Sequence, residues 1–208
     1  MVNFTVFSKI GIYSFNGNKI ITTSGGGALI SDNSEHVGKA VFYSTQAKEK
    51  AEYFQHEEEG FNYRMSNICA GIGIGQLEVI DNHLQNRRSI NKLYRDTFSG
   101  IEGVKIVTEN SDTFANYWLS TVIIDQKSSP LSLDKLKSAL ANEFIDSRLL
   151  WKPLHLQPLF KHCLFFGNGT SEYLFRNSLS LPSGSIITEK EKERIKNVLL
   201  DYINTKVN

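Results

Sequence analysis

The 208-residue sequence contains only two cysteines and has no marked excess of either sign of charge. Cys69 and Cys163 cannot form a metal cluster by themselves and do not suggest a disulfide framework, so we expect no metal site. The 23 basic and 22 acidic side chains leave a net charge of +1. A dedicated nucleic-acid-binding protein normally carries a basic face, so this balance argues against that class and we expect no nucleic-acid partner.

Long apolar runs are also lacking. No run approaches the roughly 18 residues that are needed to cross a bilayer, so we expect no membrane span. Residues 1–19 lack a basic region followed by an apolar one, which argues against a signal peptide and makes the cytoplasm the expected location. Hydrophobic residues nevertheless make up 40% of the chain, which is enough for a folded core.

The N-terminal part of the sequence alternates short apolar segments with helical patterns. The apolar residues 10–15 predict a buried strand that ends in a polar turn, and residues 28–30 predict a second short strand. A helix is expected over residues 35–47, with Asp32 or Ser34 as its N-cap.

The longest helical pattern follows a polar break. Ser66 is the expected N-cap, and apolar residues recur at helical spacing from Ile68 to Phe98. This pattern predicts one long helix, with a kink, that bridges two bodies.

After Gly100 the pattern changes to that of a small α+β domain. The sequence predicts strands over 104–107, 117–124 and 148–151, helices over 133–144 and 171–177, and an extended segment at 180–181. Thr188 is expected to cap the last helix, with Glu191 three positions on as its capping-box partner.

The first segment that could carry chemistry contains Ser14 and Lys19. A lysine that follows a buried strand can lie in a pocket sheltered from water, where its amine is freed as a nucleophile. Ser14 could reach an anionic group near the same pocket, and the glycines at 25–27 allow close backbone approach to a ligand. Taken alone, a loop lysine in a glycine-rich hairpin is the commoner interpretation of such a pattern.

The second segment spans residues 60–66. Arg64 lies near a predicted helix N-terminus, where free N–H groups and a guanidinium together suit an anion. The alternative is an ordinary helix cap beside a surface arginine. Gly71, Gly73 and Gly75 follow no strand and have the spacing G-x-G-x-G, so close helix packing explains them better than a nucleotide-binding loop.

The third segment, residues 147–158, combines cations with an aromatic side chain. Such a set can bind a nucleoside diphosphate and a sugar. The alternative is a proline-bounded surface loop with a packed tryptophan. The candidate binding residues are Arg148, Trp151, Lys152 and His155.

These segments closely resemble those of the DegT/DnrJ/EryC1/StrS family of sugar aminotransferases, which depend on pyridoxal phosphate (PLP) and have fold type I. Residues 14–27 are similar to the family's Schiff-base segment. The resemblance implies that Lys19 is the catalytic residue and binds the cofactor covalently, and that Ser14 contacts the cofactor phosphate. Relatives that dehydrate their substrate carry histidine at the lysine position, so Lys19 favours transamination.

Residues 60–66 resemble the family segment that reaches into the active site of the neighbouring subunit. The resemblance implies that Asn62 contacts the cofactor phosphate across a homodimer and that Arg64 lies close to it. Residues 147–158 resemble a stretch of members that act on UDP-linked 4-keto-6-deoxy sugars, and residues 180–184 match the family's C-terminal signature. The resemblance therefore assigns the third segment to the nucleotide-sugar substrate.

The resemblance extends over about residues 11–202 and implies an α/β fold, namely the C-terminal part of a fold-type I PLP-dependent transferase. Residues 1–60 are then a fragment of the large PLP-binding domain, 61–100 a bridging helix, and 101–208 the small α+β domain. Family members have a further N-terminal portion that supplies a phosphate loop, an aromatic side chain stacked on the pyridine ring and an aspartate for the ring nitrogen. We therefore expect this chain alone to lack part of the active site and to associate with such a portion.

Two functions remain open from the sequence. The first is a PLP-dependent aminotransferase, present as a fragment, that transfers an amino group from glutamate to a UDP- or dTDP-linked 4-keto-6-deoxy sugar in bacterial polysaccharide or glycan biosynthesis. The second is a truncated or split, non-catalytic chain that acts only by associating with a partner chain. An uncovered apolar sheet edge would favour such association.

Overall fold

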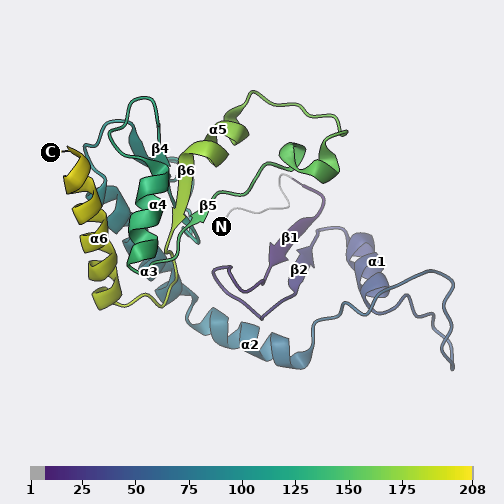
Figure 1. Ribbon diagram of the computed structural model, residues 1–208. Coiled ribbons are helices and arrows are strands. Elements are labelled where there is room, and N and C mark those ends of the chain that lie inside the picture. Colours follow the sequence, from purple (N-terminus) through teal and green to yellow (C-terminus); the bar gives the residue numbers. More distant parts are fainter. Residues whose placement is uncertain (1–7, 208) are drawn as a thin grey trace. The chain divides into compact units, whose positions relative to one another are not determined.

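The computed structural model describes residues 8–207 and divides the chain into two compact units, one up to Ile80 and one from Asp81 onward (Figure 1). The first unit contains β1 (Gly11–Ser14), β2 (Gly27–Ile30), α1 (Ser34–Ser44) and α2 (Asn67–Glu78). The second contains nearly all of α3 (Ile80–Thr97), a four-stranded sheet and the remaining helices.

Strands β1 and β2 pair in antiparallel fashion as a two-stranded sheet, with Ser14 opposite Gly27. Both predicted strands are present, but the prediction that the first is buried is wrong. Ile12 is 71% exposed and Tyr13 is also exposed, because a sheet of only two strands leaves much of its surface uncovered.

The first helix has a different N-cap from the one the sequence predicts. Asn33, rather than Asp32 or Ser34, accepts a hydrogen bond from the backbone N–H of Glu35 at 2.8 Å. The helix ends at Ser44, because the backbone of Gln46 has a φ of 70° and leaves the helical conformation.

The predicted long helix is two helices. Ser66 is the N-cap of α2, as predicted, and its hydroxyl accepts a hydrogen bond from Cys69 N at 3.2 Å. Val79, with φ −116° and ψ 11°, ends α2, and α3 begins at the next residue. The side chain that would be added at Gly73 lies 2.9 Å from Thr23 Cγ2, so this glycine permits close approach to a loop rather than to another helix.

The sheet of the second unit is antiparallel, with strand order β3-β4-β6-β5. Its strands are β3 (Val104–Ile106), β4 (Ser120–Ile124), β5 (Arg148–Leu149) and β6 (Ser178–Leu181). The other elements are α4 (Leu133–Asn142), the 3₁₀ turns η2 (Leu154–Leu156) and η3 (Pro158–Phe160), α5 (Thr170–Asn177) and α6 (Glu189–Val207). These elements agree with the predicted ones, although the strands at 120–124 and 148–149 are shorter than predicted.

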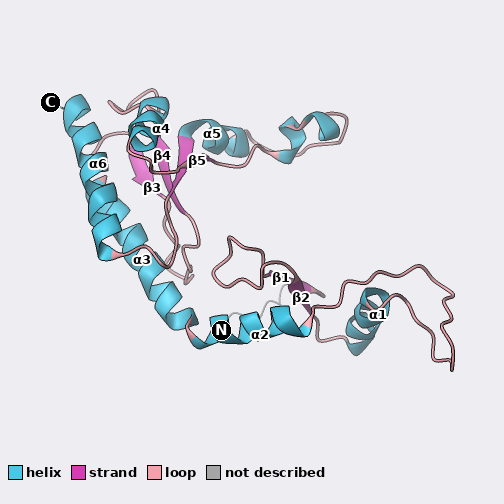
Figure 2. Ribbon diagram, turned by 60° about the horizontal axis from the view of Figure 1, so that its bottom comes forward, coloured by secondary structure: helices cyan, strands magenta, loops and turns pink. Residues whose placement is uncertain are grey.

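The core of the second unit lies where α3, α4 and α6 gather beside this sheet (Figure 2). Alternate residues of β4 are buried, and Val122 and Ile124 pack into the same cluster as Leu136 of α4 and Leu199 of α6. Removing such side chains from water supplies most of the stabilisation of a domain of this kind. The sheet is therefore held by this core, and the segment that follows β5, from residue 150 onward, starts from one of its strands.

Candidate functional site

The eight predicted site residues are divided equally between the two units. Ser14, Lys19, Asn62 and Arg64 belong to the first unit, and Arg148, Trp151, Lys152 and His155 belong to the second.

Lys19 lies in the loop that joins β1 to β2. Its backbone N–H donates to Asn16 O at 3.0 Å, which closes a turn directly after the strand, and its side chain is half-buried. Phe15 fixes both ends of this loop, since its N–H donates to Gly26 O and its carbonyl accepts from Thr23 N, each at 3.0 Å. Lys19 is therefore held on an ordered loop rather than on a free tip.

The glycines of this loop permit close backbone packing beside Ser14. A side chain at Gly27 would meet Tyr13 O at 2.4 Å, and Gly26 has a φ of 90°, which favours glycine. The hydroxyl of Ser14 lies 3.4 Å from Asn16 N, at the strand end that leads to the lysine. The glycine segment therefore packs closely against the backbone of β1, and its predicted approach to a ligand stays a prediction.

Asn62 and Arg64 lie on the extended segment before α2, and both side chains are exposed. Asn62 forms an isolated antiparallel bridge with Thr45, and Tyr63 N donates to Ser44 O at 3.0 Å. A side chain at Gly60 would lie 2.3 Å from Ala47 N, so glycine is required where this segment passes the end of α1. The backbone thus fixes the segment and leaves both polar side chains available to a ligand or a second chain.

In the second unit, Arg148 is the first residue of β5, and Trp151 lies two residues after the strand ends. The guanidinium of Arg148 pairs with Asp146 at 2.8 Å, and both side chains are well exposed. The ring of Trp151 is 70% exposed, and its centroid lies 5.7 Å from that of Trp118. Lys152, the next residue, is exposed.

His155 lies in η2 and is not an exposed loop residue. Its Nε2 lies 2.6 Å from a carboxylate oxygen of Glu172 in α5. The ring of Phe165 stacks on its imidazole, with the centroids 3.5 Å apart and the planes 17° from parallel. The backbone N–H of Glu172 itself, and then His155, lower the pKa of the Glu172 carboxyl below its ordinary value.

Three side chains that surround the predicted residues of the second unit, Trp118, Phe165 and Glu172, are absent from the candidates predicted from the sequence. Trp118 carries a usable signal, because it is the chain's other tryptophan and lies at the start of the strand predicted over 117–124. Phe165 and Glu172 carry none, because their contacts with His155 depend on how the intervening loop folds.

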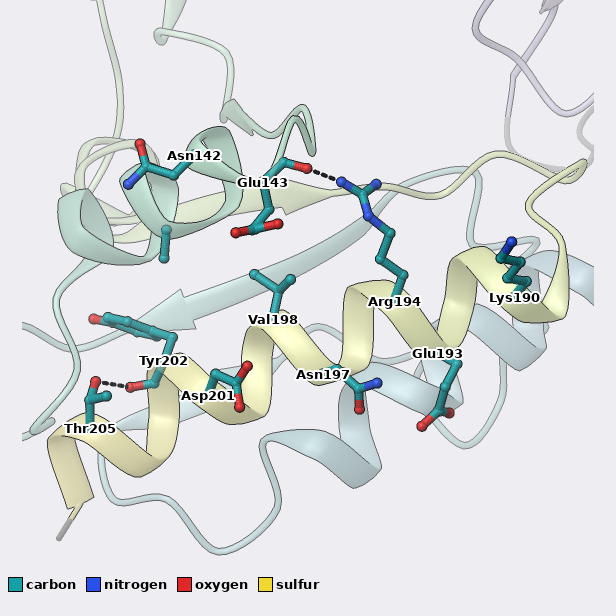
Figure 3. Close-up of a pocket in the computed structure, with 11 residues that line it drawn as sticks. Asn142, Glu143, Lys190, Glu193, Arg194, Asn197, Val198, Asp201, Tyr202 and Thr205 are labelled. Carbon is teal, nitrogen blue, oxygen red and sulfur yellow. Dashed lines mark hydrogen bonds between the residues drawn. The ribbon is translucent and has the colours of Figure 1, made fainter.

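A groove of about 870 Å³ lies elsewhere on the second unit, between α4 and α6 (Figure 3). Its lining combines apolar and charged side chains, with Glu143, Arg194, Val198 and Tyr202 among its residues. Arg194 points toward α4 and donates a hydrogen bond to the backbone carbonyl of Glu143. None of the predicted site residues lines this groove.

The described residues were also searched for metal-binding groups and for membrane-spanning helices. Among residues 8–207, no group of three or more histidine, cysteine, aspartate or glutamate side chains is arranged to hold a metal ion. None of the helices described is both long enough and apolar enough to cross a membrane.

Comparison with known proteins identifies the family. The profile of the DegT/DnrJ/EryC1/StrS aminotransferase family matches residues 4–200. The chain belongs to this family. The sequence-based assignment to this aminotransferase family is therefore confirmed.

Two curated relatives show how much of a family member this chain covers. It is 45% identical over 203 residues to EpsN of Bacillus subtilis (strain 168), which is assigned by inference as a PLP-dependent aminotransferase, and the match covers 96% of this chain and 52% of EpsN. It is 30% identical over 199 residues to a GDP-perosamine synthase of Vibrio cholerae, covering 95% of this chain and 54% of that protein. The chain thus spans about half the length of the curated relatives it matches.

A solved structure shows the same fold. The aminotransferase TlmJ from Streptoalloteichus hindustanus superposes with a TM-score of 0.86 at 19% sequence identity, covering 99% of this chain and 55% of that chain. The fold is therefore that of about half of this aminotransferase.

Proposed function

We propose that this chain carries the cofactor-binding lysine and the nucleotide-sugar contacts of a PLP-dependent aminotransferase. The observation that carries this proposal is the ordered loop after β1, in which Ser14, Lys19 and a glycine-rich return to β2 follow one another within a family match over residues 4–200. The division into a large-domain part (1–60), a bridging helix (61–100) and a small domain (101–208) belongs to the same proposal.

The residues of the first unit fit PLP by their chemistry. Lys19 offers an amine for the cofactor's aldehyde, and Ser14 offers a hydroxyl for its phosphate. Asn62 and Arg64 are both exposed before the N-terminus of α2. In a homodimer, they offer an amide and a guanidinium to the phosphate of the cofactor that the neighbouring subunit binds. When bound, PLP supplies the electron sink for amino transfer.

The protein's own part in the reaction follows from these positions. Lys19 Nζ would hold the cofactor and, once released, would act as general base and then general acid in each half of the reaction: it would remove the α-proton of the amino donor in the first half and deliver a proton to the sugar carbon that receives the amine in the second. The donor is glutamate, which leaves as the 2-oxo acid, and the acceptor is the keto group of a UDP- or dTDP-linked 4-keto-6-deoxy sugar. Arg148, Trp151, Lys152 and His155 bind and orient that acceptor.

Covalent labelling tests the role of Lys19. The chain, completed as a chimaera with the N-terminal portion of EpsN, is incubated with PLP, reduced with borohydride and digested, and the pyridoxyl-labelled peptide is identified by mass spectrometry. We expect the label on Lys19, its loss in Lys19→Arg, and its retention in the matched control Lys9→Arg. Label that is spread over other lysines, or that is unchanged in Lys19→Arg, would overturn the proposal.

A second candidate function is a non-catalytic chain that acts by associating with a partner. The first unit favours it, because Ile12, Phe54, Tyr63 and Ile68 are all highly exposed. Apolar side chains in such numbers are typical of a surface that another protein segment covers. A chimaera with the N-terminal portion of EpsN separates the two functions, because only the aminotransferase then converts glutamate and a UDP-4-keto-6-deoxy sugar.

A further inference from the structure

The exposed indole of Trp151 lies against a second indole, that of Trp118. The centroids of the two rings are 5.7 Å apart, and their planes are 30° from parallel. Trp151 is 70% exposed, whereas Trp118 is half-buried. The ring of Trp151 therefore rests on a neighbour and still leaves most of its surface open to a ligand.

The backbone of Trp118 is held by a hydrogen bond at each of its polar groups. Its N–H donates to Asn116 Oδ1 at 3.1 Å, and its carbonyl accepts from Arg87 Nη1 at 2.6 Å. Arg87 belongs to α3 and is only 7% exposed. Because the guanidinium is charged, its hydrogen bond to the carbonyl is stronger than one between neutral groups. Trp118 is thus attached to α3, a helix that packs in the core of the unit.

The backbone directly before Trp118 is strained. Tyr117 has a φ of 44°, in the left-handed region that bulky residues rarely adopt, and its side chain is buried. Its hydroxyl accepts a hydrogen bond from Glu109 N at 3.1 Å. Such strain persists only where surrounding contacts impose it, and it is common at ligand sites. The position of the Trp118 indole is therefore set by the fold rather than by its contact with Trp151.

We propose that Trp118 is a positioning residue for Trp151, whose indole it holds in place for stacking by the base of the nucleotide sugar. An exposed side chain loses rotational freedom when a ligand binds to it, and a ring that already rests on a fixed neighbour loses less. The base should therefore bind more tightly to the held ring than to a free one. This inference rests on the proposed function, in which Trp151 contacts the substrate.

The motion of Trp151 gives the first test, without a ligand. The chain contains only two tryptophans, so Trp118→Phe and Trp118→Ala each leave Trp151 as the sole one. Time-resolved fluorescence anisotropy should show a restricted indole in Trp118→Phe, which keeps an aromatic ring, and a larger amplitude of fast motion in Trp118→Ala. Equal motion of Trp151 in these two variants would overturn the inference.

The matched control for this test adds Phe114→Ala to Trp118→Phe. Phe114 is another exposed aromatic residue of the loop between β3 and β4, so its removal should leave the motion of Trp151 unchanged. Circular dichroism and thermal unfolding show whether each variant keeps its fold. If Trp118→Ala unfolds, Trp118→Leu takes its place, because leucine keeps the apolar bulk and lacks the flat ring.

Calorimetric titration with UDP gives the second test. We expect Trp118→Ala to weaken UDP binding about fivefold and Trp118→Phe by much less. In a Trp151→Ala background, Trp118→Ala should have no further effect, because positioning acts only through the indole of Trp151. An equal loss in both backgrounds would show that Trp118 acts by another route and would overturn the inference.

The outcomes separate this inference from the proposed function. If Trp151→Ala weakens UDP binding and Trp118→Ala does not, Trp118 is not a positioning residue and the proposed function stands. If Trp151→Ala leaves UDP binding unchanged, or the wild type does not bind UDP, the substrate role of Trp151 is wrong and the inference fails with it.

Discussion

The carboxylate of Glu109 lies 2.5 Å from the guanidinium of Arg88 and accepts a second hydrogen bond, from Ala115 N, at the same distance. Arg88 also donates to Ala115 O at 2.6 Å and lies over the ring of Phe114, 4.2 Å from its centroid. These contacts bind the loop between β3 and β4 to α3. Protonation of the Glu109 carboxylate should therefore weaken the attachment of this loop to α3.

Glu109 is expected to make stability depend on pH in the acid range. The hydrogen bond from Arg88, followed by that from Ala115 N, lowers the pKa of Glu109 to about 2 from its ordinary value of 4.5. The folded chain binds this proton less readily than the unfolded chain, so the stabilisation is complete above about pH 4.5 and is lost as the pH falls toward 2. Urea unfolding of the wild type and of Glu109→Gln between pH 6 and pH 3 measures it.

The expected result is a difference in urea midpoint that is largest near pH 6 and shrinks with acidification. Glu193→Gln is the matched control, because Glu193 is exposed and pairs only weakly with Lys196 at 3.5 Å. A difference for Glu109→Gln that stays constant over this pH range would contradict the assignment.

The reciprocal capping box at the start of α6 allows a prediction of how much stability is lost when the cap is removed. Thr188 N donates to a Glu191 carboxylate oxygen at 2.8 Å, and Glu191 N donates to the Thr188 hydroxyl at 3.3 Å. Thr188→Ala removes the acceptor for one of these N–H groups, and we expect it to lower the free energy of unfolding by about 0.5–2 kcal/mol. Thr188→Ser, which keeps the hydroxyl, should retain most of that stability, and equal losses in both variants would argue against capping.

The parts of the fold that the sequence predicts well are those with local chemistry. Ser66 and Thr188 were identified as caps because a hydroxyl and the helix it caps lie within a few residues of each other. The cap of α1 was misplaced, because Asp32, Asn33 and Ser34 are all capping residue types and only the backbone conformation selects among them. The position of the break at Val79 could not be predicted, because neither proline nor glycine occurs within residues 77–81.

The candidate site shows the same limit more strongly. Lys19 can be singled out because its proposed function is tied to a continuous sequence segment that resembles a known family. Glu172 could not be linked to His155, since 17 residues separate them and the contact depends on the path of the loop between. Likewise, the exposure of Ile12 depends on the number of strands in its sheet. The apolar pattern of a single strand does not predict that number.

Sharing of the cofactor site between subunits is expected if Asn62 serves a neighbouring chain. In the chimaera with the N-terminal portion of EpsN, Lys19→Ala and Asn62→Ala should each be inactive alone. Random mixing makes half of the dimers mixed, and one of the two sites in a mixed dimer regains both residues, so about a quarter of the wild-type activity should return. Mixed dimers verified by mass spectrometry that remain inactive would show that each subunit completes its own site.

The two tryptophans allow a test of the predicted substrate-binding segment, residues 147–158, by fluorescence. Trp118 and Trp151 are the chain's only tryptophans, and their rings lie 5.7 Å apart at an angle of 30°. Because Trp151 is 70% exposed, a uracil ring that stacks on it should change the tryptophan fluorescence. We expect UDP to alter the emission in a saturable manner, with uridine producing a weaker response at equal concentration.

Substitution of Trp151 decides whether the ring contributes binding energy. Stacking of a base on an aromatic side chain is worth about 1–3 kcal/mol, so Trp151→Ala should weaken UDP binding by a corresponding amount in calorimetric titration. Phe114→Ala removes another exposed aromatic ring, one that lies over Arg88 in this unit, and should leave UDP binding unchanged. If Trp151→Ala and Phe114→Ala bind UDP as the wild type does, Trp151 is a surface residue and the base is recognised elsewhere.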